Sequence, residues 1–222
     1  MNFFVLISPR DTTRPGVTDF GHVKPVHNGE APKCPNCGGF IGAIPWLPPQ
    51  RAELEVWRKD YGDIAFGPGG ERLVSERFAT LYKAEGLTGL EGFHEVEIVK
   101  VIRRGGSKLR TPPPKYYSVS ITRSRAAIDQ DASGFIHEKP IACNQCRVGS
   151  IKRWSRIVIE QNTWSGEDVF FARGLPGTIL TSEGFKEFFD RNHINNGILI
   201  NAGEYSHDFY PWEKTSKEGQ ES

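Results

Sequence analysis

All four cysteines of the chain fall into two pairs with the spacing Cys-x-x-Cys. The first pair is Cys34 and Cys37, and the second pair is Cys143 and Cys146. A two-residue spacer lets one tight turn present two thiolates to the same ion, and structural zinc is bound by four such ligands in a tetrahedron. The sequence therefore predicts a structural Zn²⁺ site formed by all four cysteines, with no open position for a substrate.

The residues that follow each pair differ. Gly38 and Gly39 follow the first pair and permit the close backbone turn of a zinc knuckle. Arg147 takes the corresponding position after the second pair, where glycine is favoured. Ordinary zinc ribbons separate their pairs by about 15–20 residues. The much longer separation here predicts that the ion joins distant parts of the chain.

Three alternatives to this zinc site remain open from the sequence. The pairs could form a redox dithiol, although neither pair lies in the βαβ context of that chemistry. The site could be empty or partly oxidised. A nearby histidine could also replace one thiolate, and the histidines close to the pairs in sequence are His22, His27 and His137.

The composition excludes some classes of protein. Hydrophobic residues make up 37% and charged residues 25% of the 222 residues, and the formal net charge is +1. The apolar runs are far shorter than the about 20 residues of a membrane span, and the near-zero charge disfavours a general nucleic-acid binder. Residues 1–7 are apolar but lack a cleavage site, so they predict a first strand and a cytoplasmic protein.

Several segments recur at nearly the same offset as the cysteine pairs. The segment DIAF at residues 63–66 matches DVFF at 168–171, and LVSERF at 73–78 matches LTSEGF at 180–185. Matches in the same order at a similar offset indicate an internal repeat. We therefore expect an α+β fold of two tandem duplicated α+β units that are joined by a shared four-cysteine zinc site.

Each unit is expected to contain a helix followed by a strand. Ser75 and Ser182 precede acidic residues, as N-cap residues of helices do. A Gly- and Pro-rich stretch between the units suits a linker, and the polar end of the chain suits a disordered tail. The predicted boundaries are 1–104 for the first unit, 105–115 for the linker, 116–213 for the second unit and 214–222 for the tail.

The two knuckles occur together with the segments LVSERF…EGLTGL at residues 73–90 and ILTSEGFKEF at residues 179–188. In this combination the chain resembles the myxobacterial double-CXXCG motif family, which includes the swarming-inhibition (Sit-type) immunity proteins. The second knuckle departs from that motif at Arg147. The resemblance implies a cytoplasmic immunity protein of bacterial competition, which binds and neutralises a cognate protein toxin. It implies no catalytic residues.

No arrangement in the sequence predicts an enzyme. Ser75 and Ser182 stand in Ser-Glu pairs and not in a Gly-x-Ser-x-Gly elbow. The glycine-rich residues 67–70 lack the Lys-Ser/Thr of a phosphate-binding loop. Residues 206–208 read Ser-His-Asp, but neighbours in sequence seldom point at one another as a catalytic triad does.

Two groups of residues are candidate partner contacts. Basic residues cluster over 100–125, and no acidic residue occurs from 98 to 128. This segment could steer an acidic toxin surface, bind the phosphates of a nucleic acid or be a solvated linker. Aromatic residues near the C-terminus suit either an interface or an anchor on the chain's own core. The predicted contacts are Arg103, Arg104, Lys108, Arg110, Tyr205, Phe209, Tyr210 and Trp212. The alternative function is a zinc-ribbon-like nucleic-acid-binding protein that uses the basic segment.

Overall fold

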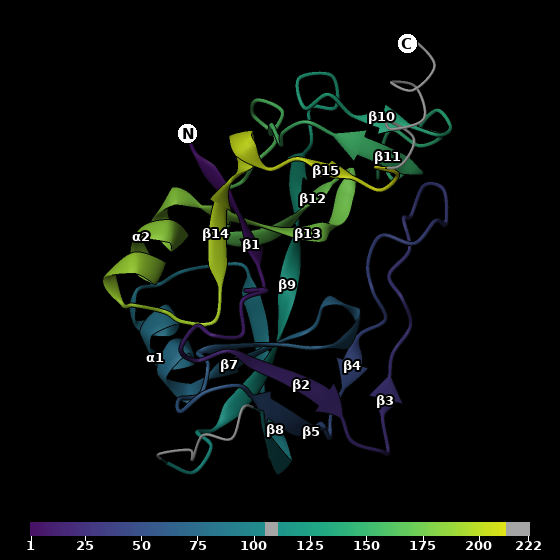
Figure 1. Cartoon of the computed structure of the whole chain (residues 1–222). Coiled ribbons are helices and arrows are strands. Elements are labelled where there is room, and N and C mark those ends of the chain that lie inside the picture. The colour runs from purple at the N-terminus through teal and green to yellow at the C-terminus, as the bar shows by residue number, and fades with distance from the viewer. Residues whose placement is uncertain (105–110, 212–222) are drawn as a thin grey trace, which may run out of the picture.

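Short segments with alternating buried and exposed side chains build the main sheet of the protein. The computed structural model describes residues 1–104 and 111–211. In this part of the chain, ten strands form one mixed sheet (Figure 1). Their bounds are β1 Phe3–Ile7, β2 Thr18–His22, β5 Arg51–Val56, β6 Ile64–Phe66, β7 Arg72–Ser75, β8 Leu90–Arg103, β9 Tyr116–Ala127, β12 Val169–Arg173, β13 Leu175–Ser182 and β14 Ile198–Asn201.

Shorter elements surround the main sheet. A two-stranded sheet consists of β3 (His27–Asn28) and β4 (Trp46–Leu47). A three-stranded sheet consists of β10 (Ile136–His137), β11 (Ile151–Trp154) and β15 (His207–Asp208). The helices are α1 (Glu76–Ala84), α2 (Glu183–Arg191) and the 3-10 turns η1 (Pro68–Gly70) and η2 (Ala202–Glu204).

Part of the main sheet closes on itself. The strand order is β14-β1-β13-β12-β9-β7-β6-β2-β5-β8, and β8 also pairs with β9. Six strands, from β9 to β8, therefore form a ring. In β5, alternate residues face the interior of this ring, so that Ala52, Leu54 and Val56 are buried. Leu73 and Tyr116 are fully buried in the same core.

The remaining four strands extend the sheet from β9. β1 comes from the N-terminus, but its partners come from the C-terminal half: Val5 lies opposite Leu180 in β13 and Ile200 in β14. β12 joins these strands to the ring, because Phe170 pairs with Thr122 in β9. A continuous sheet thus connects the two halves of the chain.

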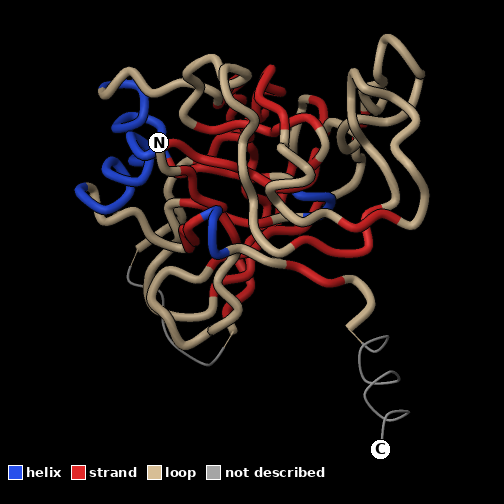
Figure 2. Tube along the Cα trace, turned by 90° about the horizontal axis from the view of Figure 1, so that it is seen from above, coloured by secondary structure: helices blue, strands red, loops and turns tan. Residues whose placement is uncertain are grey.

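The two α-helices lie side by side on one flank of the strands (Figures 1 and 2). Ser75 caps α1 by accepting a hydrogen bond from the Phe78 amide, and Ser182 caps α2 in the same way, each at 3.1 Å. These observations confirm the capping role predicted for both serines. The helices pack on each other through aromatic rings, with the Phe78 and Phe188 centroids 5.6 Å apart.

The expected fold of two tandem α+β units is wrong. The described residues form a mostly β structure in which each α-helix has only nine residues. The physical reason is that β1 satisfies its backbone hydrogen bonds with β13 and β14, and β9 many of its own with β7 and β8, which are strands from the other half of the chain. The strand expected after the first helix is β8, which extends over 14 residues because it pairs along its length with β9 and β5 in turn.

The predicted linker lies partly outside the described residues, and the predicted tail lies wholly outside them. Residues 111–115 contain neither helix nor strand, whereas residues 105–110 and 212–222 are not described. Among the described residues, no helix is long and apolar enough to cross a membrane.

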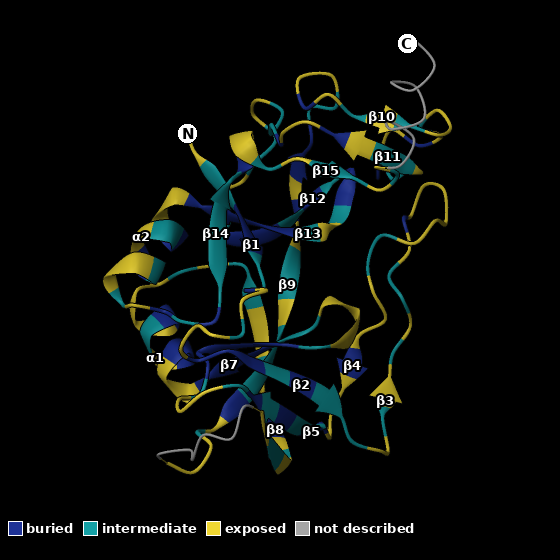
Figure 3. Ribbon diagram, viewed as in Figure 1, coloured by how far each residue is buried: buried dark blue, intermediate teal, exposed yellow. Residues whose placement is uncertain are grey.

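Residues 27–47 form an arm that holds the first cysteine pair. β3 and β4 pair at its base, where Asn28 lies opposite Trp46. Trp46 is buried and packs on Phe20 of β2, which fixes the base to the ring core. The rest of the arm stands apart from the main sheet and is largely exposed (Figure 3). The arm therefore depends on contacts near its tip to hold its position.

Candidate metal centre

The four cysteines come together where the tip of the arm meets the loop between β10 and β11. Their sulfur atoms all lie within 4.8 Å of one another. The Sγ atoms of Cys34 and Cys143 are 3.9 Å apart, and those of Cys37 and Cys146 are 3.8 Å apart. Four sulfurs at about 2.3 Å from one zinc ion are separated by about 3.8 Å in a tetrahedron. The cluster therefore has the size of a tetrathiolate metal site.

All four thiols are free. The sulfur separations are far longer than the about 2.05 Å of a disulfide bond. Cys34, Cys143 and Cys146 are buried, whereas Cys37 is exposed. The donor set is thus four soft ligands with one solvent-facing side, and it could hold a metal ion.

The two knuckles have the same kind of backbone turn. In the first, the Gly38 amide donates to the Cys34 carbonyl at 2.9 Å, and Gly38 has a φ of +71°. In the second, the Arg147 amide donates to the Cys143 carbonyl at 2.9 Å, and Arg147 has a φ of +56°. Arg147 therefore occupies the left-handed conformation that favours glycine, which costs about 1–2 kcal/mol.

The side chain of Arg147 makes contacts that glycine lacks. Its Nη1 atom lies 2.5 Å from Glu160 Oε2 and donates to the Ile128 carbonyl at 3.3 Å. Ile128 and Ile159 form a β-bridge directly beside these groups. The arginine thus ties the second knuckle to the main body of the protein and offsets part of the backbone strain.

Hydrogen bonding and burial shift the thiol pKa values in opposite directions. The Asn36 side-chain amide donates to Cys143 Sγ at 3.4 Å and, with backbone amides of the second knuckle, lowers the pKa of that thiol to about 6. Burial raises the pKa of the Cys146 thiol to about 11. Cys143 is therefore a thiolate at neutral pH, whereas Cys146 has to lose a proton when it binds a metal ion.

Two of the three nearby histidines have partners other than the cysteines. His22 Nε2 lies 2.5 Å from Glu71 Oε2, and His137 Nε2 lies 2.6 Å from Gln130 Oε1. His27 is exposed in β3. The candidate metal ligands that the structure brings together are the four cysteines.

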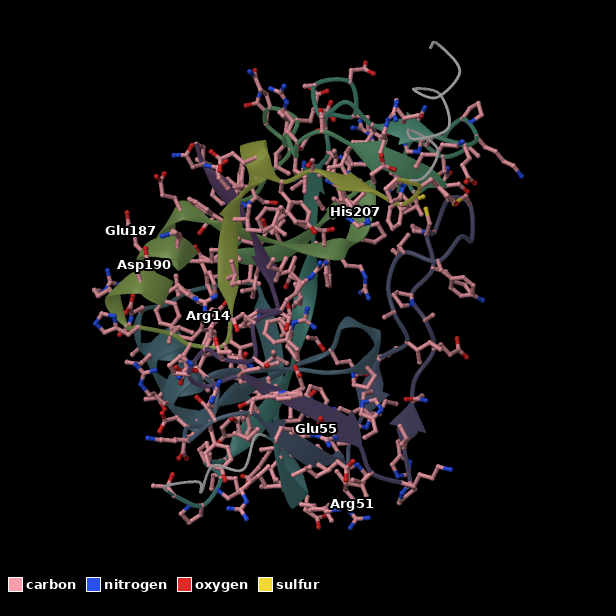
Figure 4. All side chains as sticks on the ribbon, in the orientation of Figure 1. Arg14, Arg51, Glu55, Glu187, Asp190 and His207 are labelled. Carbon is pink, nitrogen blue, oxygen red and sulfur yellow. The ribbon has the colours of Figure 1, made fainter. Side chains whose placement is uncertain are left out.

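The predicted partner contacts are spread over different regions. Arg103 ends β8, and Arg104 binds the Glu55 carboxylate with two nitrogens, at 3.2 and 3.0 Å. Glu55 and Arg51 both belong to β5, in the lower part of Figure 4. Three of the predicted contacts lie outside the described residues: Lys108, Arg110 and Trp212.

The described aromatic residues near the C-terminus gather around Trp154. The ring centroids of Tyr205 and Phe209 lie 6.2 and 5.9 Å from that of Trp154. His207, labelled in Figure 4, lies 5.1 Å from the same ring. The Tyr210 amide donates to Asp208 Oδ1 at 2.9 Å. Through these contacts, residues 205–210 pack against their own chain. His207, the histidine of the Ser-His-Asp run, is one of the packed residues.

Asn36 and Arg173 are missed by the sequence reasoning. Asn36 lies inside the first knuckle, so its proximity to a thiolate was a local signal. Arg173 Nη1 donates to the Gln145 carbonyl in the second knuckle at 3.3 Å. No local pattern indicates this contact, because Arg173 and Gln145 belong to different elements.

A family comparison defines the class of the protein. The model of an immunity protein family, Imm11, matches residues 44–203. The chain belongs to this immunity protein family. The match includes the second cysteine pair and most of the main sheet, but it begins after Cys34 and Cys37. It agrees with the expected immunity class and does not confirm the double-CXXCG, Sit-type resemblance. No curated protein matches the chain.

Proposed function

We propose that the protein neutralises a cognate antibacterial toxin by direct protein–protein contact and uses no catalysis of its own. Membership of the Imm11 family is the observation that carries this proposal. An immunity protein has a toxin as its partner, and a rigid, preorganised surface binds such a partner at the lowest entropic cost. We place this action in the cytoplasm, where the four thiols stay reduced.

We further propose that Cys34, Cys37, Cys143 and Cys146 hold a structural Zn²⁺ ion. The sulfur separations support this assignment, because they approach those of a zinc tetrahedron. The ion would join the tip of the arm to the loop between β10 and β11. Zinc bound in this way fixes the surface around the arm and contributes to folding, with no open position for a substrate.

The alternative of a nucleic-acid binder gains no support from the arrangement of the basic segment. Arg104 is paired with Glu55, and Lys115 lies 3.5 Å from Glu95. Arg103 pairs with β5 in the sheet, whereas Arg123 pairs with β12. The described charges are thus partly neutralised and divided between two parts of the molecule, and a nucleic-acid backbone needs a continuous basic path.

Growth rescue tests the proposed function. The toxin-like product of the neighbouring gene is expressed in a sensitive host, with this protein or with an empty vector. We expect growth to be restored only by this protein, and we expect an inactive toxin variant to co-purify with it. Failure of both readouts, with the toxin shown to be active and this protein shown to be folded, contradicts the proposal.

A further inference from the structure

A pocket of about 420 Å³ opens beside the cysteine cluster. One wall is the tip of the arm, including Ile41, and another is the second knuckle, including Val148. β9 and the hairpin of β12 and β13 supply the rest of the lining, including Arg123 and Phe171, which are partners in the sheet. The pocket therefore combines the arm and the second knuckle, which the cysteine cluster brings together, with strands that the main sheet brings together.

The pocket is basic. Its described lining contains three arginines, Arg123, Arg125 and Arg173, and no acidic residue. Arg173 donates from Nε to the Arg125 carbonyl at 3.0 Å and from Nη1 to the Gln145 carbonyl at 3.3 Å. Backbone carbonyls hold the guanidinium in place but do not neutralise its charge. Within the described part of the chain, none of the three arginines forms an ion pair.

The nearby carboxylate of Glu167 is already engaged. It accepts hydrogen bonds from the hydroxyls of Ser124, at 3.0 Å, and Ser165, at 3.2 Å. Ser124 is buried between Arg123 and Arg125 on β9, and these two arginines are exposed. Among the described residues neither arginine forms an ion pair with Glu167, so the two guanidinium groups remain available to an anion that comes from outside.

Apolar side chains accompany this charge. Ile41, Val148 and Phe171 line the pocket. Next to it on the arm, Phe40 and Ile44 are 63% and 54% exposed. Exposed apolar residues beside a charged pocket are typical of protein-binding surfaces. A partner that fits this surface carries carboxylates together with apolar side chains.

We propose that this pocket binds an acidic peptide segment of the toxin, and the inference rests on the proposed function. The carboxylates of the segment meet Arg123, Arg125 and Arg173, because guanidinium groups bind carboxylates through two parallel hydrogen bonds. A neighbouring apolar side chain of the segment packs against Ile41 and Phe171. A pocket with apolar walls suits a short peptide better than the continuous backbone of a nucleic acid.

A peptide titration tests the pocket independently of any toxin. The probe is a fluorescein-labelled peptide of sequence Asp-Glu-Leu-Asp-Glu, and its matched control is Asn-Gln-Leu-Asn-Gln. We expect the full-length protein to bind the acidic peptide and to bind the amide peptide at least tenfold more weakly. Equal binding of the two peptides, no binding of either, or full displacement by sulfate at equal concentration overturns the proposal.

Charge-neutral variants locate the binding. The double variant Arg123→Gln/Arg125→Gln should weaken binding of the acidic peptide at least tenfold. The control Arg10→Gln/Arg156→Gln removes the same charge at exposed positions outside the pocket and should change it less than twofold. Equal effects of the two double variants overturn the proposal. If the pocket variant does not fold, the single variant Arg123→Gln replaces it, with at least a threefold loss expected.

The same variants in the growth assay separate the two proposals. If the wild type rescues growth and the pocket variant, although folded, does not, both proposals are supported. If both rescue growth equally, the pocket is not the toxin site, and the proposed function stands. If the wild type itself fails to rescue, the proposed function fails, and so does the toxin segment as the occupant.

Discussion

Asp63 and Asn195, which are 132 residues apart, bind each other through two hydrogen bonds. The Asp63 amide donates to Asn195 Oδ1 at 2.6 Å, and the Asn195 amide donates to Asp63 Oδ2 at 3.2 Å. Asp63 also accepts a hydrogen bond from the hydroxyl of Ser75, the N-cap of α1, at 3.0 Å. The loop after α2 thus holds the residue that orients the start of α1.

A second contact mirrors the first. The Thr88 amide, in the loop after α1, donates to Asp168 Oδ2 at 2.9 Å, and Asp168 Oδ1 accepts from the Ser182 hydroxyl at 2.6 Å. Each half of the chain therefore supplies a loop that holds an aspartate of the other half, and this aspartate accepts a hydrogen bond from the N-cap serine. This reciprocity explains why the two halves pack as one structure.

Loss of the charge at Asp63 should destabilise the fold. Its side chain is 8% exposed and lies 2.6 Å from Arg77 Nη1. We expect Asp63→Asn to lower the free energy of unfolding by about 2–3 kcal/mol, because an amide cannot accept all of these hydrogen bonds. Urea denaturation measures the change. The control Asp60→Asn, at an exposed position, should change it by less than about 0.5 kcal/mol, and equal effects would contradict the role of Asp63.

Removal of the metal should release the arm. We expect the purified protein to contain one zinc ion, and a chelator or Cys34→Ser to lower the melting temperature by about 5 °C or more. Binding of the acidic peptide should weaken as well, because Cys34 and Cys146 line the same pocket as the arginines. Metal analysis and thermal unfolding provide the measurement. An unchanged melting temperature after complete chelation would rule out a structural ion.

Asn36 should tune the affinity for the metal in a pH-dependent way. Its hydrogen bond lowers the pKa of Cys143, so that the thiolate is present at pH 7 without a metal ion. In Asn36→Ala the pKa rises, protons compete with the metal, and the affinity for zinc should fall about tenfold at pH 7. Because the competition disappears once both proteins are deprotonated, the difference should shrink towards pH 9.

A chromophoric chelator measures this affinity between pH 6 and pH 9. Asn144→Ala is the control, since Asn144 is an exposed asparagine inside the second knuckle. It should leave the affinity within about twofold of the wild type. An effect of Asn36→Ala that is constant over this pH range would show that Asn36 acts by some means other than the thiol pKa.

Substitutions of Arg147 can distinguish the effect of backbone strain on stability from the effect of its ion pair with Glu160. Both Arg147→Gly and Arg147→Ala remove the contact with Glu160, but only glycine adopts a φ of +56° without steric strain. We expect Arg147→Gly to be more stable than Arg147→Ala by about 1 kcal/mol in urea denaturation. Equal stabilities would mean that the turn relaxes out of the left-handed region.

The cysteine cluster could be predicted from the sequence because four thiols with knuckle spacing leave few alternatives, and the capping serines could be predicted because capping is local. The path of the sheet could not. Pairing of Val5 with Leu180 and Ile200 depends on contacts across almost the whole chain, and a local hydrophobic periodicity in the sequence does not indicate such contacts. The arginine pocket was missed for the same reason, since Arg173 joins Arg123 and Arg125 only through the pairing of β12 with β9.

The most direct test of neutralisation by contact is a binding titration between the zinc-loaded protein and an inactive variant of the cognate toxin. We predict a tight complex of defined stoichiometry, which weakens at least tenfold with Arg123→Gln/Arg125→Gln and is unaffected by Arg10→Gln/Arg156→Gln. Absence of any complex, with both proteins folded and the active toxin neutralised in cells, would contradict neutralisation by direct contact.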